Sequence, residues 1–137
     1  MKLLFALTVT ASLLLGASSK LDDRTGLVWQ DNPEVANIEK SYHDAKQYCE
    51  QLKTDGFDDW RLPTLSELYS IVDMKRERPA LRYGFEMRVD EWFWTANPFA
   101  GDPKKEAWRL SMSYGEAEPS RQGRTLHVRC VRGKRMR

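Results

Sequence analysis

The stretch DWRLPTLSEL, residues 59–68, decides how the middle of this 137-residue chain folds. Thr64 and Glu67 stand at the T-x-x-E spacing of a capping box, in which each side chain bonds the backbone N–H of the other residue. Pro63 stands directly before the cap and holds the residue that precedes it in an extended conformation. Apolar side chains then recur at helical spacing, at Leu65, Leu68, Tyr69 and Val72. The stretch therefore predicts an extended chain that turns into an amphipathic helix.

We interpret this stretch as a structural motif. Its members are Trp60, Arg61, Leu62, Pro63, Thr64 and Glu67. The motif sets the angle at which the chain enters the helix. Arg61 is expected to bond a backbone carbonyl or an aspartate.

A second helix is predicted upstream, after Ser41. Ser41 and Asp44 stand at S-x-x-D spacing, which indicates a helix N-cap with an acid in the first turn. The apolar positions that follow at helical spacing are Ala45, Tyr48, Cys49 and Leu52. Gly56 is suited to end this helix.

Several other segments show strand patterns. Residues 27–29 predict an opening strand and residues 92–95 another, while residues 108–112 and 126–131 alternate apolar with other side chains. Residues 74–90 show no period and predict a long loop. The order strand, helix, helix, strands predicts an α+β domain with a mainly antiparallel sheet.

The five tryptophans divide into two groups. We expect Trp29, Trp60, Trp94 and Trp108 to lie in the core, because each stands in a predicted strand or beside the helix entry. Trp92 shares its strand with Phe93, which must occupy the opposite face. Stacking of tryptophans on sugar rings is the functional alternative.

The first residues have the pattern of a leader. A lysine follows the initiating methionine, residues 3–15 are almost unbroken apolar, and residues 16–19 are small. We assign residues 1–18 to a secretory signal peptide. An uncleaved anchor is the alternative, but the apolar run is shorter than the roughly 20 residues that span a bilayer. We therefore expect residues 19–137 to form a single exported domain, periplasmic or secreted from a bacterium.

Cys49 and Cys130 are the two cysteines of the chain. Thiols oxidise in exported proteins, and two cysteines allow one pairing, so we expect a structural disulfide. A reactive or metal-binding thiol pair is the alternative. It needs neighbouring ligands, and His43 and His127 are isolated in the sequence. We predict neither a metal site nor a cofactor.

Charge is polarised along the chain. The formal net charge is +2, but residues 121–137 contain seven bases and no acid. Arginine forks bond sulfate, phosphate and carboxylate groups well. An anionic glycan or an envelope protein is therefore the expected partner. The candidate cations are Lys75, Arg76, Arg78, Arg82, Arg88, Arg121, Arg124, Arg129 and Arg132.

A second interpretation of the same charges stays open. Residues 133–137 form a short basic tail that is also consistent with a solvated end of the chain. The acidic side chains of the N-terminal half can neutralise the remaining basic side chains. Nucleic acid is not expected as a partner, because the chain carries an export leader and no nucleic-acid-binding motif.

Signatures of calcium binding and catalysis are sparse. Ala96-Asn97-Pro98 lacks the acid of the calcium-binding lectin motifs. The neighbouring carboxylates Asp58-Asp59 and Asp90-Glu91 point to opposite faces if they lie in strands, which does not favour an acid/base pair. We therefore predict no catalytic residue and no enzyme activity.

Five further short motifs, together with residues 59–68, match one family in order and spacing. They are GLVWQD (26–31), YC (48–49), WTA (94–96), AW (107–108) and VRCV (128–131). On these motifs the chain resembles the Lcl C-terminal domain family, a bacterial C-type-lectin-like group, from about residue 22 to residue 132. The resemblance implies two helices against small antiparallel sheets, adjacent N- and C-terminal strands, and a Cys49–Cys130 bond.

The resemblance implies less about function than about fold. The founding member of the family is a collagen-like adhesin whose domain binds sulfated glycans, and this sequence has no collagen-like repeat. We expect an exported, non-catalytic binding module for an anionic glycan or another envelope component. An assembly module that uses exposed aromatics such as Trp92 or Phe99 is the alternative. A more distant one is an enzyme, since residues 61–67 also resemble the R-L-P-T-E-x-E-W of the longer formylglycine-generating enzymes.

Overall fold

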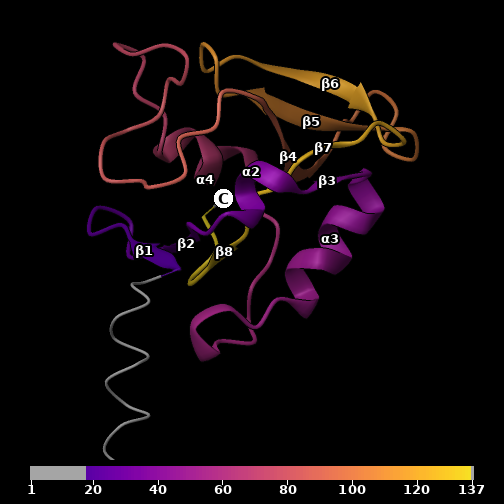
Figure 1. Cartoon of the computed structure of the whole chain (residues 1–137). Helices are drawn as coiled ribbons and strands as arrows, with labels where there is room; N and C mark the ends of the chain where they lie inside the picture. Colours follow the sequence, from indigo (N-terminus) through magenta and orange to yellow (C-terminus); the bar gives the residue numbers. More distant parts are fainter. Residues whose placement is uncertain (1–17, 137) are drawn as a thin grey trace, which may run out of the picture.

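The computed structural model describes residues 18–136, which form two β-sheets with helices beside them (Figure 1). The predicted leader lies outside the described residues, apart from Ser18. Within residues 18–136, no helix is long and apolar enough to cross a lipid bilayer. In chain order the elements are β1 (Ser19–Leu21), β2 (Val28–Gln30), α2 (Glu34–Asn37), β3 (Glu39–Lys40), α3 (Tyr42–Gln51), the 3₁₀ turn η1 (Thr54–Gly56), α4 (Leu65–Ser70), β4 (Trp92–Pro98), β5 (Glu106–Ser111), β6 (Ala117–Arg121), β7 (Leu126–His127) and β8 (Val131–Arg132).

The smaller sheet brings the two ends of the described chain together. Its strand order is β1-β2-β8, and both pairs are antiparallel. The predicted opening strand is β2, and Trp29 lies opposite Val131 of β8. The adjacency of the N- and C-terminal strands is thus confirmed. β1, which the sequence did not reveal, lies on the other side of β2.

The larger sheet has the strand order β3-β7-β4-β5-β6. Its β4–β5 and β5–β6 pairs are antiparallel, whereas β7 runs parallel to β4. β4 continues to Pro98, beyond the predicted end of that strand, and its register shifts between Trp94 and Pro98. The architecture is α+β with mainly antiparallel sheets, as predicted.

The predicted last strand, residues 126–131, is divided between the two sheets. β7 pairs with the larger sheet and β8 with the smaller one, so the segment crosses from one to the other. Every residue from Leu126 to Val131 is buried, on both sides of the segment. The prediction of a single strand was wrong because a chain that bridges two sheets is enclosed on all sides.

Both predicted helices start where their caps predict. The Ser41 hydroxyl accepts the Asp44 N–H at the start of α3. Thr64 and Glu67 form the complete capping box at the start of α4. α3 ends at Gln51, however, earlier than Gly56, whose φ of +79° closes η1 instead.

The side chains form two buried clusters. The first packs α4 and the long loop against both sheets, and the second packs α3 against the larger sheet around the cysteines. The first contains Leu27, Trp29, Val35, Leu68, Ile71, Leu81, Phe85, Phe93, Leu110, Met112 and Val131. The second contains Tyr42, Ala45, Cys49, Leu52, Trp60, Leu62, Trp94, Ala107, Leu126, Val128 and Cys130.

Three of the four tryptophans expected in the core are buried there, namely Trp29, Trp60 and Trp94. Trp108 is half-buried. Trp92 is also half-buried, and the guanidinium of Arg109 lies 3.9 Å from the centre of its ring. Trp92 therefore has a cation over its ring, which leaves it poorly placed to stack on a sugar.

Candidate functional site

Glu67 is the centre of a buried hydrogen-bond network. Its carboxylate accepts two parallel bonds from the Arg61 guanidinium, both at 2.7 Å. The N–H groups of Thr64 and Met136 donate to it at 2.8 and 2.9 Å. Burial by itself raises the pKa of Glu67, but these bonds outweigh it and hold the pKa below its usual value. A carboxylate of this kind is poorly suited to proton transfer near neutral pH.

The same motif holds the C-terminal segment in place. Arg61 pairs with Val131 through two backbone bonds of 2.9 Å, and its guanidinium donates to the Gly133 carbonyl at 3.1 Å. Met136 packs against the first core cluster. Arg61 thus bonds backbone carbonyls as predicted, but its carboxylate partner is Glu67 and not an aspartate. These contacts hold the backbone of Gly133 and Met136, while the side chains of Lys134 and Arg135 are exposed, in agreement with a solvated end.

The disulfide joins Cys49 of α3 to Cys130, which lies between β7 and β8. Both cysteines are fully buried. The predicted structural disulfide is confirmed, and neither sulfur is available to act as a thiol. Among the residues that the structure describes, no group of three or more His, Cys, Asp or Glu side chains is arranged to hold a metal ion.

Arg129 is buried, which corrects its assignment to an anion-binding surface. It is 1% exposed and donates to the Gln30 carbonyl at 2.8 Å and to the Asp31 carboxylate at 3.1 Å. It also bonds the carbonyl of Met87 in the long loop. Burial lowers the pKa of Arg129 to about 10, an effect that Asp31 opposes, so the guanidinium stays protonated at neutral pH. Arg129 therefore supports the fold from inside.

Arg132 is occupied by a neighbouring carboxylate. Its guanidinium donates to both oxygens of Asp59, at 2.6 and 3.1 Å, and lies 3.7 Å from the centre of the Phe57 ring. The hydrogen bond from Arg132 lowers the pKa of Asp59. With Arg129 buried and Arg132 paired, β8 and the segment before it present no anion-binding face.

Three of the five cations of the predicted loop bond carboxylates or backbone carbonyls within the protein. Arg76 pairs with Asp73 at 3.1 Å, and Arg82 pairs with Asp22 at 3.3 Å. Arg88 donates to two backbone carbonyls of its own loop, at 2.7 and 2.9 Å. These three arginines stabilise the loop, and only part of their hydrogen-bonding capacity is left for a ligand.

Arg78 and Lys75 are the exposed cations of this loop. The Arg78 guanidinium donates to the Tyr114 hydroxyl at 2.8 and 3.0 Å, a contact that raises the pKa of Arg78. Lys75 forms no ion pair within residues 18–136.

Arg121 and Arg124 line a different feature, which we call the basic hollow. It has a volume of about 690 Å³ and lies between the β4–β5 connection and the β6–β7 turn. Its lining residues are Asp102, Lys104, Lys105, Glu106, Arg121, Gln122, Gly123 and Arg124. All of its four cations are exposed, and none of them forms an ion pair within the described chain.

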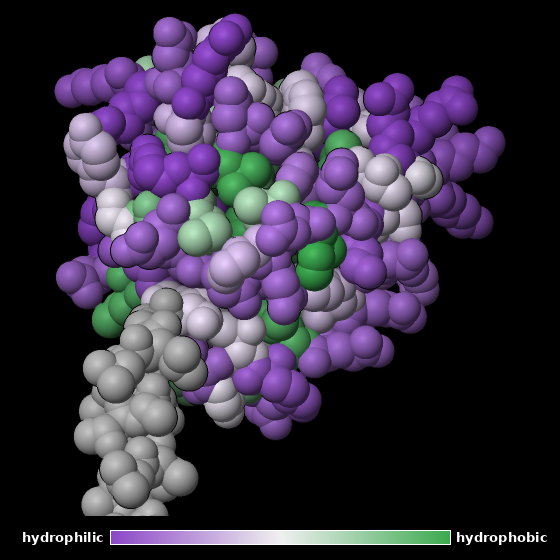
Figure 2. Space-filling model, in the orientation of Figure 1, coloured by the Kyte–Doolittle hydropathy of each residue, from purple (hydrophilic) through white to green (hydrophobic). Residues whose placement is uncertain are grey.

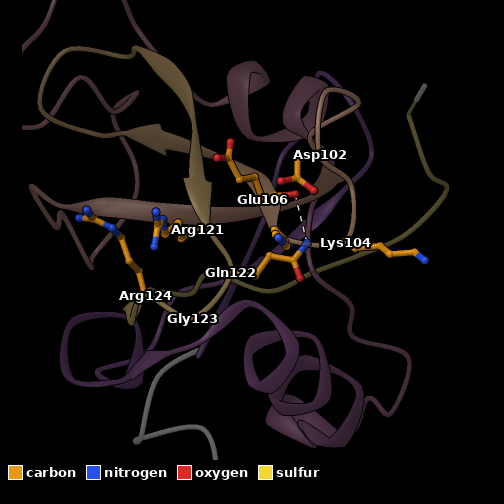
Figure 3. A pocket seen from close by; sticks show the side chains of 8 residues that line it. Asp102, Lys104, Glu106, Arg121, Gln122, Gly123 and Arg124 are labelled. Carbon is orange, nitrogen blue, oxygen red and sulfur yellow. Dashed lines mark hydrogen bonds between the residues drawn. The ribbon is translucent and has the colours of Figure 1, made fainter.

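The charged groups of the basic hollow occupy separate sides of it. Figure 3 shows Arg121 and Arg124 extending to one side and Lys104 to the other, with the carboxylates of Asp102 and Glu106 along a third. The Gln122 side chain is fixed by bonds to the backbone carbonyls of residues 103 and 106, at 3.0 and 3.1 Å. These bonds join the β6–β7 turn to the β4–β5 connection and to the start of β5.

The predicted cations do not form one patch. The loop of residues 74–90 bonds the end of β5, where the Arg78 N–H donates to the Ser113 carbonyl at 2.8 Å. The basic hollow lies at the other end of the β5–β6 pair, where Arg121 is opposite Glu106. The two groups therefore lie at opposite ends of the larger sheet (Figure 1).

Sequence reasoning missed Lys104 and Lys105 as members of a site. They follow the Gly101-Asp102-Pro103 turn, which marks them as exposed but gives no reason to group them with Arg121 and Arg124. The antiparallel register that sets Glu106 opposite Arg121 brings the two turns together. One signal was available in the sequence. The two lysines directly follow a turn and precede a predicted strand, and a strand that pairs with it would bring the basic segment at residues 121–124 next to them.

Comparison with known proteins identifies the family. A search of curated proteins gives no match to this chain. The family model described as the Lcl C-terminal domain matches residues 20–132, which include the disulfide and all of both sheets except Ser19 of β1. The α+β architecture and the meeting of the chain ends agree with the C-type-lectin-like fold expected of that family. This chain belongs to the Lcl C-terminal domain family.

Proposed function

We propose that this protein is an exported, non-catalytic binding module that recognises an anionic glycan through the basic hollow. One observation carries the proposal: the four cations line one hollow of about 690 Å³, and none of them forms an ion pair with a carboxylate of the described chain. Cations that the protein does not use itself remain available to a ligand. Membership of a lectin-like family supports the choice of a glycan.

The chemistry of the lining suits a sulfated or carboxylated sugar. The two arginines offer planar forks to an anionic group, and the two lysines add mobile point charges. The carboxylates of Asp102 and Glu106 are positioned to accept hydrogen bonds from sugar hydroxyls. All the lining residues are polar or glycine, so the hollow favours a hydrophilic ligand.

Two features support export. Residues 1–18 have the composition of a signal peptide. The buried Cys49–Cys130 disulfide is typical of proteins that mature in an oxidising compartment. An anionic glycan of the cell envelope is a ligand that an exported protein can reach.

Removing the four cations of the hollow tests the proposal. In the variant Lys104→Ala/Lys105→Ala/Arg121→Ala/Arg124→Ala we expect affinity for heparin to fall about a hundredfold at low salt, since each cation near an anionic surface contributes about 1 kcal/mol at best. Retention on heparin and its elution by NaCl measure the effect. Wild-type binding should weaken steeply with salt, because exposed charges are screened.

A variant of equal charge is the control. Lys46→Ala/Lys53→Ala/Lys134→Ala/Arg135→Ala also removes four exposed cations, none of which lines the hollow. We expect this control to elute close to the wild type. Equal losses in the two variants, or no retention of the wild type at low salt, would reject the proposed site.

A further inference from the structure

Three large apolar side chains that reach the surface lie in neighbouring positions beside the long loop. The most exposed large ones within residues 18–136 are Tyr83 at 72%, Met74 at 70% and Leu21 at 56%. All three line a pair of adjoining hollows beside the long loop. The face drawn in Figure 2 is mainly hydrophilic, with small and separate apolar areas. Three exposed apolar side chains at one place therefore need an explanation.

The two hollows form a continuous surface. One has a volume of about 170 Å³ and the other about 570 Å³, and they share Arg24, Arg82 and Tyr83. We call the whole the Tyr83 surface. Its lining residues are Lys20, Leu21, Asp22, Asp23, Arg24, Val72, Asp73, Met74, Lys75, Arg82, Tyr83 and Phe85.

The Tyr83 surface is built from two segments that the fold holds together. The Lys20 side chain lies so close over Gly84 that a Cβ there would stand 2.8 Å from Lys20 Cε, and Gly84 has a φ of +101°. Lys20 also lies over the Phe85 ring, at 5.7 Å from its centre. The carboxylate of Asp31 holds the loop in place, because it accepts hydrogen bonds from the N–H groups of residues 86 and 87 at 2.8 and 2.9 Å. The exposed side chains thus project from a fixed support.

The charges of this surface that the protein does not use are mostly positive. The carboxylates of Asp22 and Asp73 are paired with arginines. Lys20, Arg24 and Lys75 form no ion pair in the described part of the chain, and Asp23 is the remaining carboxylate of the lining. Protruding apolar groups are therefore surrounded by an excess of free cations.

We propose that the Tyr83 surface binds the face of an anionic lipid bilayer, with Leu21, Met74 and Tyr83 entering the headgroup region. Apolar side chains ringed by lysine and arginine match an interface whose outer layer is anionic and whose interior is apolar. Tyrosine suits that boundary because its ring is apolar and its hydroxyl is polar. The Arg76 guanidinium lies 3.2 Å from the centre of the Tyr83 ring, so it covers one face of the ring and adds a cation beside it. The long stems of Lys20 and Lys75 keep their charges at headgroup level while the apolar groups enter.

The outward direction of these side chains favours a membrane over a peptide ligand. A peptide-binding groove shelters its apolar lining inside a concave wall. Here the three apolar side chains that line the hollows are more than half exposed, so the hollows do not shelter them from water. Exposed apolar side chains lose contact with water when they enter the headgroup region of a bilayer, because lipids can rearrange around them.

Co-sedimentation with vesicles tests this proposal. We expect the wild type to bind vesicles of phosphatidylcholine with phosphatidylglycerol and to bind pure phosphatidylcholine at least tenfold more weakly. Met74→Ser/Tyr83→Ser should lose about tenfold through the apolar contacts. Lys20→Ala/Arg24→Ala/Lys75→Ala should lose about a hundredfold at low salt. Residues 1–17 are common to all variants, so the differences report on the Tyr83 surface.

The control variant removes cations from the other end of the sheet. Lys104→Ala/Lys105→Ala should leave vesicle binding within about twofold of the wild type and weaken heparin binding. The variants of the Tyr83 surface should show the reverse, so the membrane proposal and the glycan proposal fail separately. Equal vesicle binding by the wild type and both variants of this surface would overturn the proposal, as would no binding to anionic vesicles at all.

A fluorescent probe at the surface tests the proposal without relying on a variant that loses binding. Tyr83→Trp places an indole at the centre of the surface with little change in shape. On addition of anionic vesicles its emission, taken as a difference from the wild type, should shift to the blue and be quenched by brominated acyl chains. An unshifted and unquenched emission, with the protein in the vesicle pellet, would show that another surface binds and would overturn the assignment.

Discussion

Replacing both cysteines by alanine is expected to lower the free energy of unfolding by about 4.5 kcal/mol while leaving the fold in place. The bond closes a loop of 81 residues, which in the chain-entropy model removes that much freedom from the unfolded state. The second core cluster still packs α3 against the larger sheet without the bond. Urea unfolding of the wild type and of Cys49→Ala/Cys130→Ala, followed by tryptophan fluorescence, measures the difference.

Alanine is the appropriate replacement because both positions are fully buried, where a serine hydroxyl would need a partner. Wild-type protein unfolded in the presence of a reductant serves as the control and should lose a similar amount. The open chain should also show a steeper dependence on urea, because its unfolded state is less compact. A loss below about 1 kcal/mol would contradict the loop-closure account.

Glu67→Gln is expected to lower the free energy of unfolding by about 3 kcal/mol at pH 7. The amide cannot satisfy the two Arg61 donors and the N–H groups of Thr64 and Met136 as the carboxylate does. Breaking a buried pair typically costs about 3–5 kcal/mol, and we take the lower end because the Arg61 side chain is 18% exposed to water. Urea unfolding at pH 7 checks the value.

The effect of Glu67→Gln should depend on pH in a defined direction. The pKa of Glu67 is lower in the folded protein than its usual value of 4.5. A carboxyl of this kind stabilises the fold above its unfolded pKa, and the contribution is lost as the pH falls through the folded pKa. The difference between the wild type and Glu67→Gln should therefore be full at pH 7 and shrink below about pH 4.5. A difference that is the same at pH 7 and pH 3 would contradict this role.

Glu118→Gln provides a control with the same chemical change. Glu118 pairs with Arg109 at the surface, where the Glu118 side chain is 52% exposed. Such exposed pairs contribute about 0–1 kcal/mol, so this variant should remain near the wild type at all pH values tested. Equal effects of the two substitutions would show that burial at Glu67 does not matter.

Much of the fold could be predicted because its signals are local. The caps of Ser41 and Thr64 each depend on bonds within one helical turn, so both helix starts were found. The end of α3 was misplaced because Gly56 ends a neighbouring turn rather than the helix itself. Tyr69 was expected on the buried face of α4 and is exposed, since a short helix buries only a narrow stripe.

The candidate site was harder to predict, because a charge in a sequence does not show its surroundings. Arg129 and Arg121 look alike in the basic C-terminal segment. The crossing between the sheets encloses Arg129 beside Asp31, whereas Arg121 ends an edge strand and faces water. The partner of each arginine is set by contacts across the fold, and these are absent from any local pattern.

The sequence by itself determined the helix starts, the family, the single possible disulfide and the uneven distribution of acidic and basic residues along the chain. Each of these depends on neighbouring residues or on composition. Only the tertiary structure decided which charges stay free, because that depends on pairing between distant segments. It buried Arg129, paired Arg132 with Asp59, placed Arg121 and Arg124 in the basic hollow, and placed Lys75 and Arg82 at the Tyr83 surface. A ligand can bind the charged side chains that have no partner within the protein, and the net charge of the chain does not show which these are.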